Sequence, residues 1–315
     1  MKRGVISSLV VLSLLATLIL SSCMPSVVGD KVAVIPLNGL ITAEGASFIY
    51  GQVITPDLVR EQLNKAEGDR AVKAIVLRIE SPGGAVAPCQ EILEEIEKVK
   101  GKKPIVVSMG SEAASGGYYI SAKANRIVAL PGTLTGSIGV ISQIPNIKGL
   151  YEKLGIEMQT FKSGKYKDMY SGFRELTPEE KEIMQRMTDE YYEQFVEVVA
   201  EGRGMSKEAV KNLATGQLYT GAEAEELGLV DELGGLDRAI DVAAELAGVT
   251  APRVEYYKPA QKSLLELLLG MNLSTLRSAI ELKLLGLSGQ DVVLLETLSH
   301  TYPQPQYLAS PIPLP

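Results

Sequence analysis

The feature that most constrains the fold is an alternation of short apolar, β-branched segments with segments that have helix-forming patterns. Strands are predicted at 32–37, 72–79, 104–109 and 126–130. Helices are predicted at 55–66, 89–100, 115–124, 177–202, 207–213 and 236–246. Strands that alternate with helices favour a layered α/β fold, in which helices flank a mainly parallel sheet.

Charge and length restrict the class of protein. The chain has 315 residues, a net charge of −7 and no dense basic tract, so nucleic acid is not an expected partner. Roughly 220 residues remain when the two ends are set aside, which is enough for one domain with a sizeable core.

Cysteine and histidine are almost absent. The two cysteines, Cys23 and Cys89, cannot form a disulfide framework, and Cys89 is expected to be a buried free thiol. The one histidine, His300, lies in the C-terminal tail. A Ser-His-Asp triad around a core histidine and a His-rich metal site are therefore excluded, and no cofactor is implied.

The N-terminus has the pattern of an export signal. A basic start at 1–3 precedes an apolar run at 4–20, and Leu-Ser-Ser-Cys ends at Cys23. This ending resembles a bacterial lipobox, so residues 1–22 are interpreted as a signal peptide and Cys23 as the lipidated residue. An uncleaved membrane anchor is the alternative. Both place residues after the linker 23–30 outside the cytoplasm, at the cell membrane.

Small residues surround a serine where the third predicted strand meets a helix. The segment 110–119 reads Gly-Ser-Glu-Ala-Ala-Ser-Gly-Gly-Tyr-Tyr, and Ser115 lies at the junction. Free amides near a helix N-terminus, including that of Gly116, favour a developing oxyanion. The segment 81–84, Ser-Pro-Gly-Gly, follows another strand and offers a second amide donor. Ligands of open α/β sheets bind at such strand ends.

A nucleophilic serine needs a base, and without a usable histidine the candidate is lysine. A lysine with its ordinary pKa of about 10.4 is protonated at neutral pH, so its surroundings must favour the neutral form. The segment 163–168, Ser-Gly-Lys-Tyr-Lys-Asp, offers Lys165 and Lys167. Spacing alone does not choose between them.

Together, the segments 81–84, 110–119, 135–140 and 163–168 closely resemble motifs of the signal peptide peptidase A (SppA) family of serine–lysine peptidases. The resemblance implies a Clp-protease/crotonase fold of repeated β-β-α units. By the same resemblance, Ser115 is the nucleophile, Lys167 the general base and Ser137 the residue that orients this lysine. Gly83 and Gly116 match the amides of the oxyanion hole.

The resemblance also implies substrates and assembly. Family substrates are cleaved signal peptides left in the membrane, and a peptidase domain is expected at 31–258. Family members form rings whose sites are shared between neighbouring protomers, and single-domain members form larger rings such as octamers. A helical segment and a proline-rich tail are expected at 259–315, and the tail segment 306–310 is a candidate self-ligand for the active site of a neighbouring protomer.

Alternative functions on the same fold would require other catalytic residues or none. A crotonase-type acyl-CoA enzyme needs a carboxylate pair, and a Clp-type protease needs a histidine soon after the serine motif. A membrane lipoprotein scaffold that lost its activity, and a protease of misfolded envelope proteins, are the remaining alternatives, because fold alone does not establish function.

Overall fold

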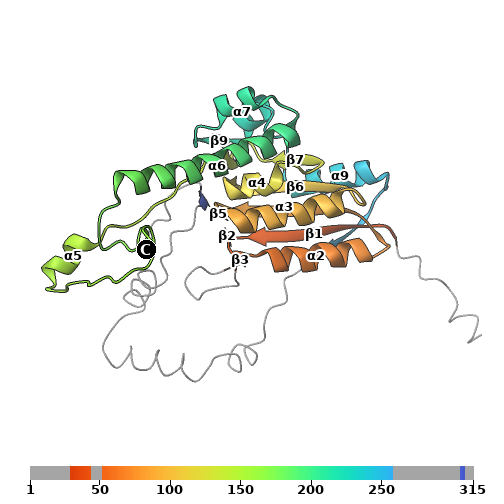
Figure 1. Ribbon diagram of the computed structural model, residues 1–315. Helices are drawn as coiled ribbons and strands as arrows, with labels where there is room; N and C mark the ends of the chain where they lie inside the picture. Colours follow the sequence, from red (N-terminus) through yellow and green to blue (C-terminus); the bar gives the residue numbers. More distant parts are fainter. Residues whose placement is uncertain (1–28, 44–51, 258–305, 309–315) are drawn as a thin grey trace, which may run out of the picture.

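The computed structural model describes residues 29–43, 52–257 and 306–308 (Figure 1). The predicted signal at 1–22, Cys23, His300 and the predicted helical segment after residue 258 lie outside these residues. No helix within the described ranges has the length and hydropathy of a membrane span.

A mainly parallel sheet forms the centre of the fold. The strands at its middle are β1 (Lys31–Asn38), β4 (Val72–Ser81), β6 (Ile105–Ala114) and β7 (Arg126–Ala129), with β10 (Glu232–Leu233) and β11 (Arg253–Tyr256) at the edges. All the pairings along this path are parallel. Two shorter strands, β8 (Leu134–Gly136) and β9 (Leu218–Thr220), extend the sheet beside the end of β6.

Helices cover both faces of the sheet (Figure 1). On one face pack α2 (Pro56–Gly68), α3 (Val86–Lys100) and α4 (Gly116–Ser121), and on the other packs α9 (Leu236–Ala247). Alternate residues of each strand face opposite sides, so Ile35 and Ile75 join the larger core while Val34 and Val76 pack against α9. The predicted α/β architecture is confirmed.

A second, small sheet lies beside the nucleophile segment. It contains β2 (Leu40–Ile41), β3 (Val53–Ile54), β5 (Gly83–Ala85) and β12 (Gln306–Leu308). The chain enters β5 directly from Pro82, and α3 begins at Val86, three residues before its predicted start. The segment 81–84, which was predicted only to follow a strand, is therefore partly a strand itself.

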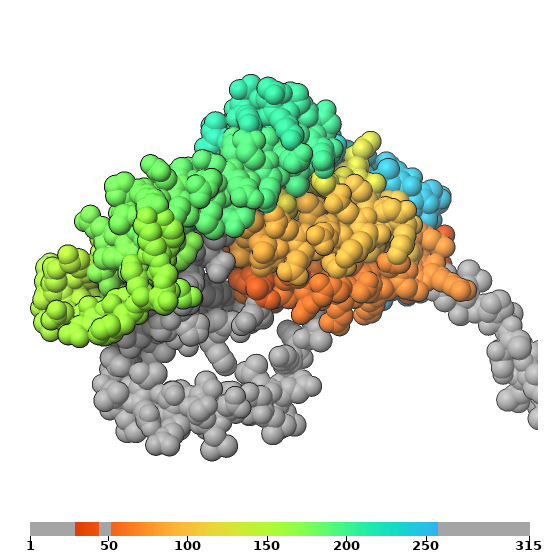
Figure 2. Space-filling view, viewed as in Figure 1, coloured from red at the N-terminus to blue at the C-terminus, as the bar shows by residue number. Residues whose placement is uncertain are grey.

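The long helix α6 (Pro178–Arg203) links the body to a projecting segment, here called the arm (residues 141–176), which contains α5 (Lys148–Lys153). Thr177 and Glu180 form a capping box at the start of α6, where the helix was predicted to begin. Figure 2 shows the arm, in yellow-green, as a lobe beside the packed body. The remaining helices, α7 (Lys207–Leu213) and α8 (Gly221–Glu226), pack near the other end of α6.

Candidate active site

Ser115 occupies a strained turn between β6 and α4. Its φ of +51° lies in a region that residues other than glycine rarely adopt. Strained backbone of this kind is found most often at functional sites. The residue is fully buried, and its hydroxyl oxygen has no hydrogen-bond partner among the described residues. A buried hydroxyl without a partner is costly, so it is a feature that needs a functional explanation.

Two glycine segments meet beside this serine. Gly116 is the first residue of α4, where amides lack intrahelical partners. A Cβ at Gly116 would lie 3.1 Å from the Gly83 Cα and 2.8 Å from the Cys89 sulfur, so only glycine fits. The Gly83 amide donates to the Ser81 hydroxyl at 3.2 Å. The structure thus brings the two predicted oxyanion-hole residues, Gly83 and Gly116, together. The Gly83 amide is hydrogen-bonded to Ser81.

A bulge in β6 carries the chain to Ser115. Ile79 pairs with Met109 but Ser81 pairs with Ala113, so β6 contains extra residues opposite Glu80. The Glu80 carboxylate accepts the amides of Ser111 and Glu112, at 2.9 and 3.1 Å. Burial and the nearby Glu80 charge raise the pKa of the Glu112 carboxyl. The sequence prediction ended this strand at Met109 and missed the bulge.

Ser137 lies next to the nucleophile turn. The Ser115 amide donates to the Gly136 carbonyl at 2.8 Å, which fixes the end of β8 against the turn. Ser137 itself is buried, has a φ of +47°, and its amide donates to the Gln217 carbonyl. The backbone of Ser137 is therefore held one residue away from the contact with the Ser115 amide.

The two tyrosines after the nucleophile, Tyr118 and Tyr119, are buried, and so is the Cys89 thiol, as predicted for that cysteine. The Tyr118 hydroxyl donates to the Leu229 carbonyl at 2.9 Å, and the Tyr119 ring packs edge-on against Phe195. Cys89 is fully buried, and burial raises the pKa of its thiol well above the ordinary range. A protonated, inaccessible thiol is a packing group rather than a nucleophile.

Lys167 lies on the arm and its side chain is solvent-exposed. Its ammonium group makes no ion pair or side-chain hydrogen bond in the part of the chain that the structure describes. Lys165, by contrast, pairs with Glu179, and this contact raises the pKa of the Lys165 ammonium. Lys162 pairs with Asp168 at 2.6 Å. Within the described ranges, Lys167 is therefore the lysine of this loop that has no side-chain partner.

The buried serine and the exposed lysine are not joined within one chain. Ser115 has no accessible surface, whereas Lys167 faces solvent on a segment that projects from the body. Four of the five predicted site residues thus converge at the ends of β5, β6 and β8, and the fifth remains apart. Nothing in the sequence indicated that Lys167 lies solvent-exposed on the arm.

Comparison with known proteins decides the family. A model described as peptidase family S49 matches residues 97–250. A relative from Enterococcus faecium, provisionally named signal peptide peptidase SppA, is 40% identical over 72% of this chain and 67% of its own length. The chain belongs to peptidase family S49.

Further S49 relatives agree. A Synechocystis protein that is provisionally named a protease is 45% identical over 61% of this chain and 69% of its own length. Protease 4 of Salmonella typhi is 38% identical over 74% of this chain, but over only 37% of its own length. The S49 assignment confirms the predicted SppA resemblance, the protease class and the Clp-protease/crotonase-like fold.

Proposed function

We propose that this S49 protease is a serine endopeptidase that uses Ser115 as nucleophile and Lys167 as general base. The observation that carries the proposal is the strained, fully buried Ser115 hydroxyl, which has no partner among the described residues. Lys167 fits as the base because its loop neighbours Lys162 and Lys165 are engaged by carboxylates. A carboxylate partner favours the charged form of a lysine, and Lys167 has no such partner among the described residues.

The chemistry follows from these roles. Neutral Lys167 removes the hydroxyl proton as the Ser115 oxygen bonds to the substrate carbonyl carbon. The oxyanion is stabilised by the Gly116 amide and by the Gly83 amide, which exchanges its contact with the Ser81 hydroxyl for the oxyanion. The C–N bond then breaks, the lysine gives its proton to the leaving amine, and an acyl-enzyme remains. Water attacks the ester, again with the lysine as base, and restores the serine. Ser137 would orient the lysine.

The separation of serine and lysine supports a site shared between copies. A second copy of the chain would bring the Lys167 of its arm to Ser115, as in the ring expected from the family. A heterologous contact that repeats around an axis closes into such a ring. An octamer is the expected ring. The number of protomers is set by the angle through which each protomer is rotated relative to its neighbour.

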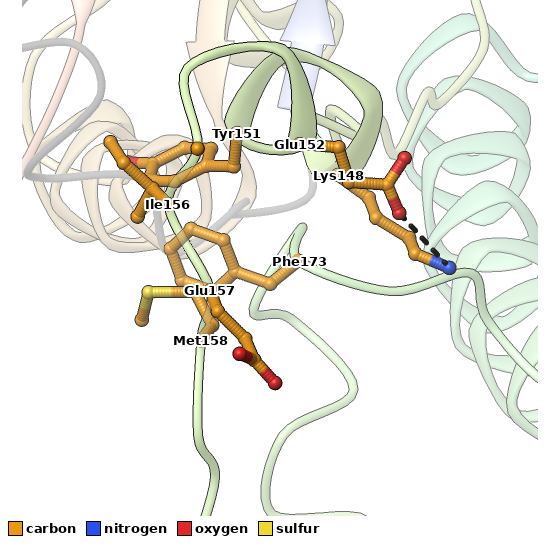
Figure 3. Close-up of a pocket in the computed structure, with 8 residues that line it drawn as sticks. Lys148, Tyr151, Glu152, Ile156, Glu157, Met158 and Phe173 are labelled. Atoms are coloured by element: carbon orange, nitrogen blue, oxygen red, sulfur yellow. Dashed lines mark ion pairs between the residues drawn. The ribbon is translucent and has the colours of Figure 1, made fainter.

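The arm has the surface that such a contact requires. Apolar side chains of the arm are unusually exposed, with Phe161 at 94% and Leu154 at 64%. A pocket of about 460 Å³ opens between α5 and the following segment, and Figure 3 shows Tyr151, Ile156 and Phe173 around it. Exposed apolar surface of this kind marks interaction sites.

The edge of β5 indicates how a peptide would bind. Strand β12 from the C-terminal tail pairs antiparallel with β5, with Leu308 opposite Gly83. An extended substrate added at this edge would place its carbonyl near Gly83, and strand addition recognises backbone rather than sequence. This pairing supports the predicted self-ligand role of the tail, within one chain rather than between neighbours. Cleaved signal peptides and other short hydrophobic peptides are the proposed substrates.

We further propose that the protein is tethered to the cell membrane, by lipidated Cys23 or by an uncleaved anchor, with the catalytic body outside the cytoplasm. The basic start, the apolar run and the Leu-Ser-Ser-Cys ending support this location. A protease at the membrane surface would meet cleaved signal peptides there. Envelope-protein quality control is the second candidate, because the same location exposes it to misfolded proteins.

The test is hydrolysis of a hydrophobic fluorogenic peptide by the full chain in detergent. The parent is expected to be active, Ser115→Ala and Lys167→Ala are expected to be inactive, and Lys165→Ala is the matched control that retains activity. Activity that persists in Ser115→Ala would overturn the mechanism. An assembled parent without activity would favour the inactive-scaffold reading.

A further inference from the structure

Arg174 lies between two carboxylates at the base of the loop that carries Lys167. Its guanidinium donates to both oxygens of Asp168, at 2.7 and 2.9 Å. It also donates to both oxygens of Glu180, at 2.7 Å each. Paired donation to a carboxylate fixes orientation as well as distance, which a single contact does not.

Glu180 anchors this arrangement to the body. It belongs to the first turn of α6, its side chain is 3% exposed, and it accepts the Thr177 amide in the capping box. Arg174 lowers the pKa of the Glu180 carboxyl to about 2, so the anchor remains charged at any physiological pH. Asp168, in the loop that carries Lys167, has a side chain that is 13% exposed and pairs with Arg174. Arg174 therefore connects a fixed helix end to the residue after Lys167.

The same contacts engage the Asp168 carboxylate fully. Arg174 and Lys162 occupy both Asp168 oxygens, and they lower the pKa of that carboxyl far below its ordinary range. A free carboxylate adjacent in sequence would pair with the Lys167 ammonium and favour its charged form. Among the described residues, the charged or titratable groups that make side-chain contacts in and around the loop are Lys162, Lys165, Tyr166, Asp168 and Arg174 on the arm and Glu179 and Glu180 on α6.

We propose that Arg174 is a positioning residue for catalysis, which fixes the Lys167 loop on α6 and withholds Asp168 from the Lys167 ammonium. This role rests on the proposed function of Lys167 as the general base. Arg174 does not touch the reacting atoms. It acts through Asp168, and its removal changes both the placement of the base and the pH at which the base is free.

An ordinary surface ion pair is the alternative, and such pairs contribute little. The chain offers a matched control for it. Arg238 also bridges two carboxylates, Glu232 and Glu245, and its side chain is 35% exposed, against 30% for Arg174. Arg238 lies on α9, on the sheet face opposite the nucleophile helix. A purely structural role predicts the same outcome for Arg174→Gln and Arg238→Gln.

The experiment measures kcat, KM and the rise of kcat/KM with pH for the full chain in detergent. We expect Arg174→Gln to lower kcat at pH 7 by about tenfold or more, with KM unchanged, and to move the midpoint of the rise upward by about one pH unit. Arg238→Gln is expected to leave all three unchanged. Adding Asp168→Asn to Arg174→Gln is expected to return the midpoint to the parent value, because the competing carboxylate is gone.

Arg174→Lys provides the second variant in case Arg174→Gln does not fold. It keeps the charge but not the paired geometry, so a reduced kcat with an unshifted midpoint is expected. An Arg174→Gln profile that matches Arg238→Gln, or an Arg174→Lys enzyme with parent kcat, would overturn the positioning role. Full activity of Lys167→Ala would instead refute the proposed function. The two failures are therefore distinguishable.

Discussion

Replacing Ser115 by alanine is expected to abolish proteolysis and, at the same time, to stabilise the fold. The Ser115 hydroxyl is fully buried and has no partner among the described residues. An unsatisfied buried hydroxyl costs about 1–3 kcal/mol, and removing its oxygen forfeits only a few packing contacts. Alanine retains the strain of the positive φ, so the comparison isolates the hydroxyl. The net gain should be about 1 kcal/mol.

The assay is thermal unfolding in a Lys167→Ala background, so that no neighbouring lysine can serve as partner. For a domain of this size, about 1 kcal/mol corresponds to a rise in Tm of about 2–4 °C. Ser121→Ala is the matched control, because Ser121 is equally buried but donates to the Gly117 carbonyl at 2.6 Å. That control should melt lower than the Lys167→Ala parent. A Ser115→Ala protein that melts at or below the parent would refute the reasoning.

Two further predictions concern the oxyanion hole and acid stability. Gly116→Ala should lower kcat/KM by on the order of 100-fold, because its Cβ would lie 2.8 Å from the Cys89 sulfur and would displace the Gly116 amide from the oxyanion. Gly101→Ala, which has open space around it, should be neutral in the same peptide assay. The carboxyls of Asp168 and Glu180 have pKa values below their ordinary 3.8 and 4.5, so their contribution is complete above about pH 4.5 and is lost as the pH falls. Tm should therefore decline from about pH 4.5 downward, less steeply in Asp168→Asn, and equal slopes would contradict the assignment.

Local patterns were sufficient to predict the body of the fold. The apolar run of β4 and the N-terminus of α6 lie where the sequence predicted them, because both signals depend on neighbouring residues. The glycines at 83 and 116 also converge as predicted, since parallel strands end at the same edge of a sheet.

Features set by distant residues could not be predicted. The bulge that prolongs β6 depends on the Glu80 carboxylate of the neighbouring strand. The difference between Lys165 and Lys167 depends on Glu179 at the start of α6, and the resemblance, rather than the spacing, selected Lys167. Small residues and lysines in a loop carry no local signal of such contacts.

Mixing two inactive variants tests the shared Ser115–Lys167 site most directly. Ser115→Ala and Lys167→Ala chains, co-expressed in equal amounts and purified together, would form some interfaces with an intact serine from one copy and an intact lysine from its neighbour. Random assembly predicts recovery of about a quarter of the parent activity, because only one in four pairings has both groups. Neither variant alone should cleave the peptide. Mixed assemblies without activity would contradict a site completed between copies.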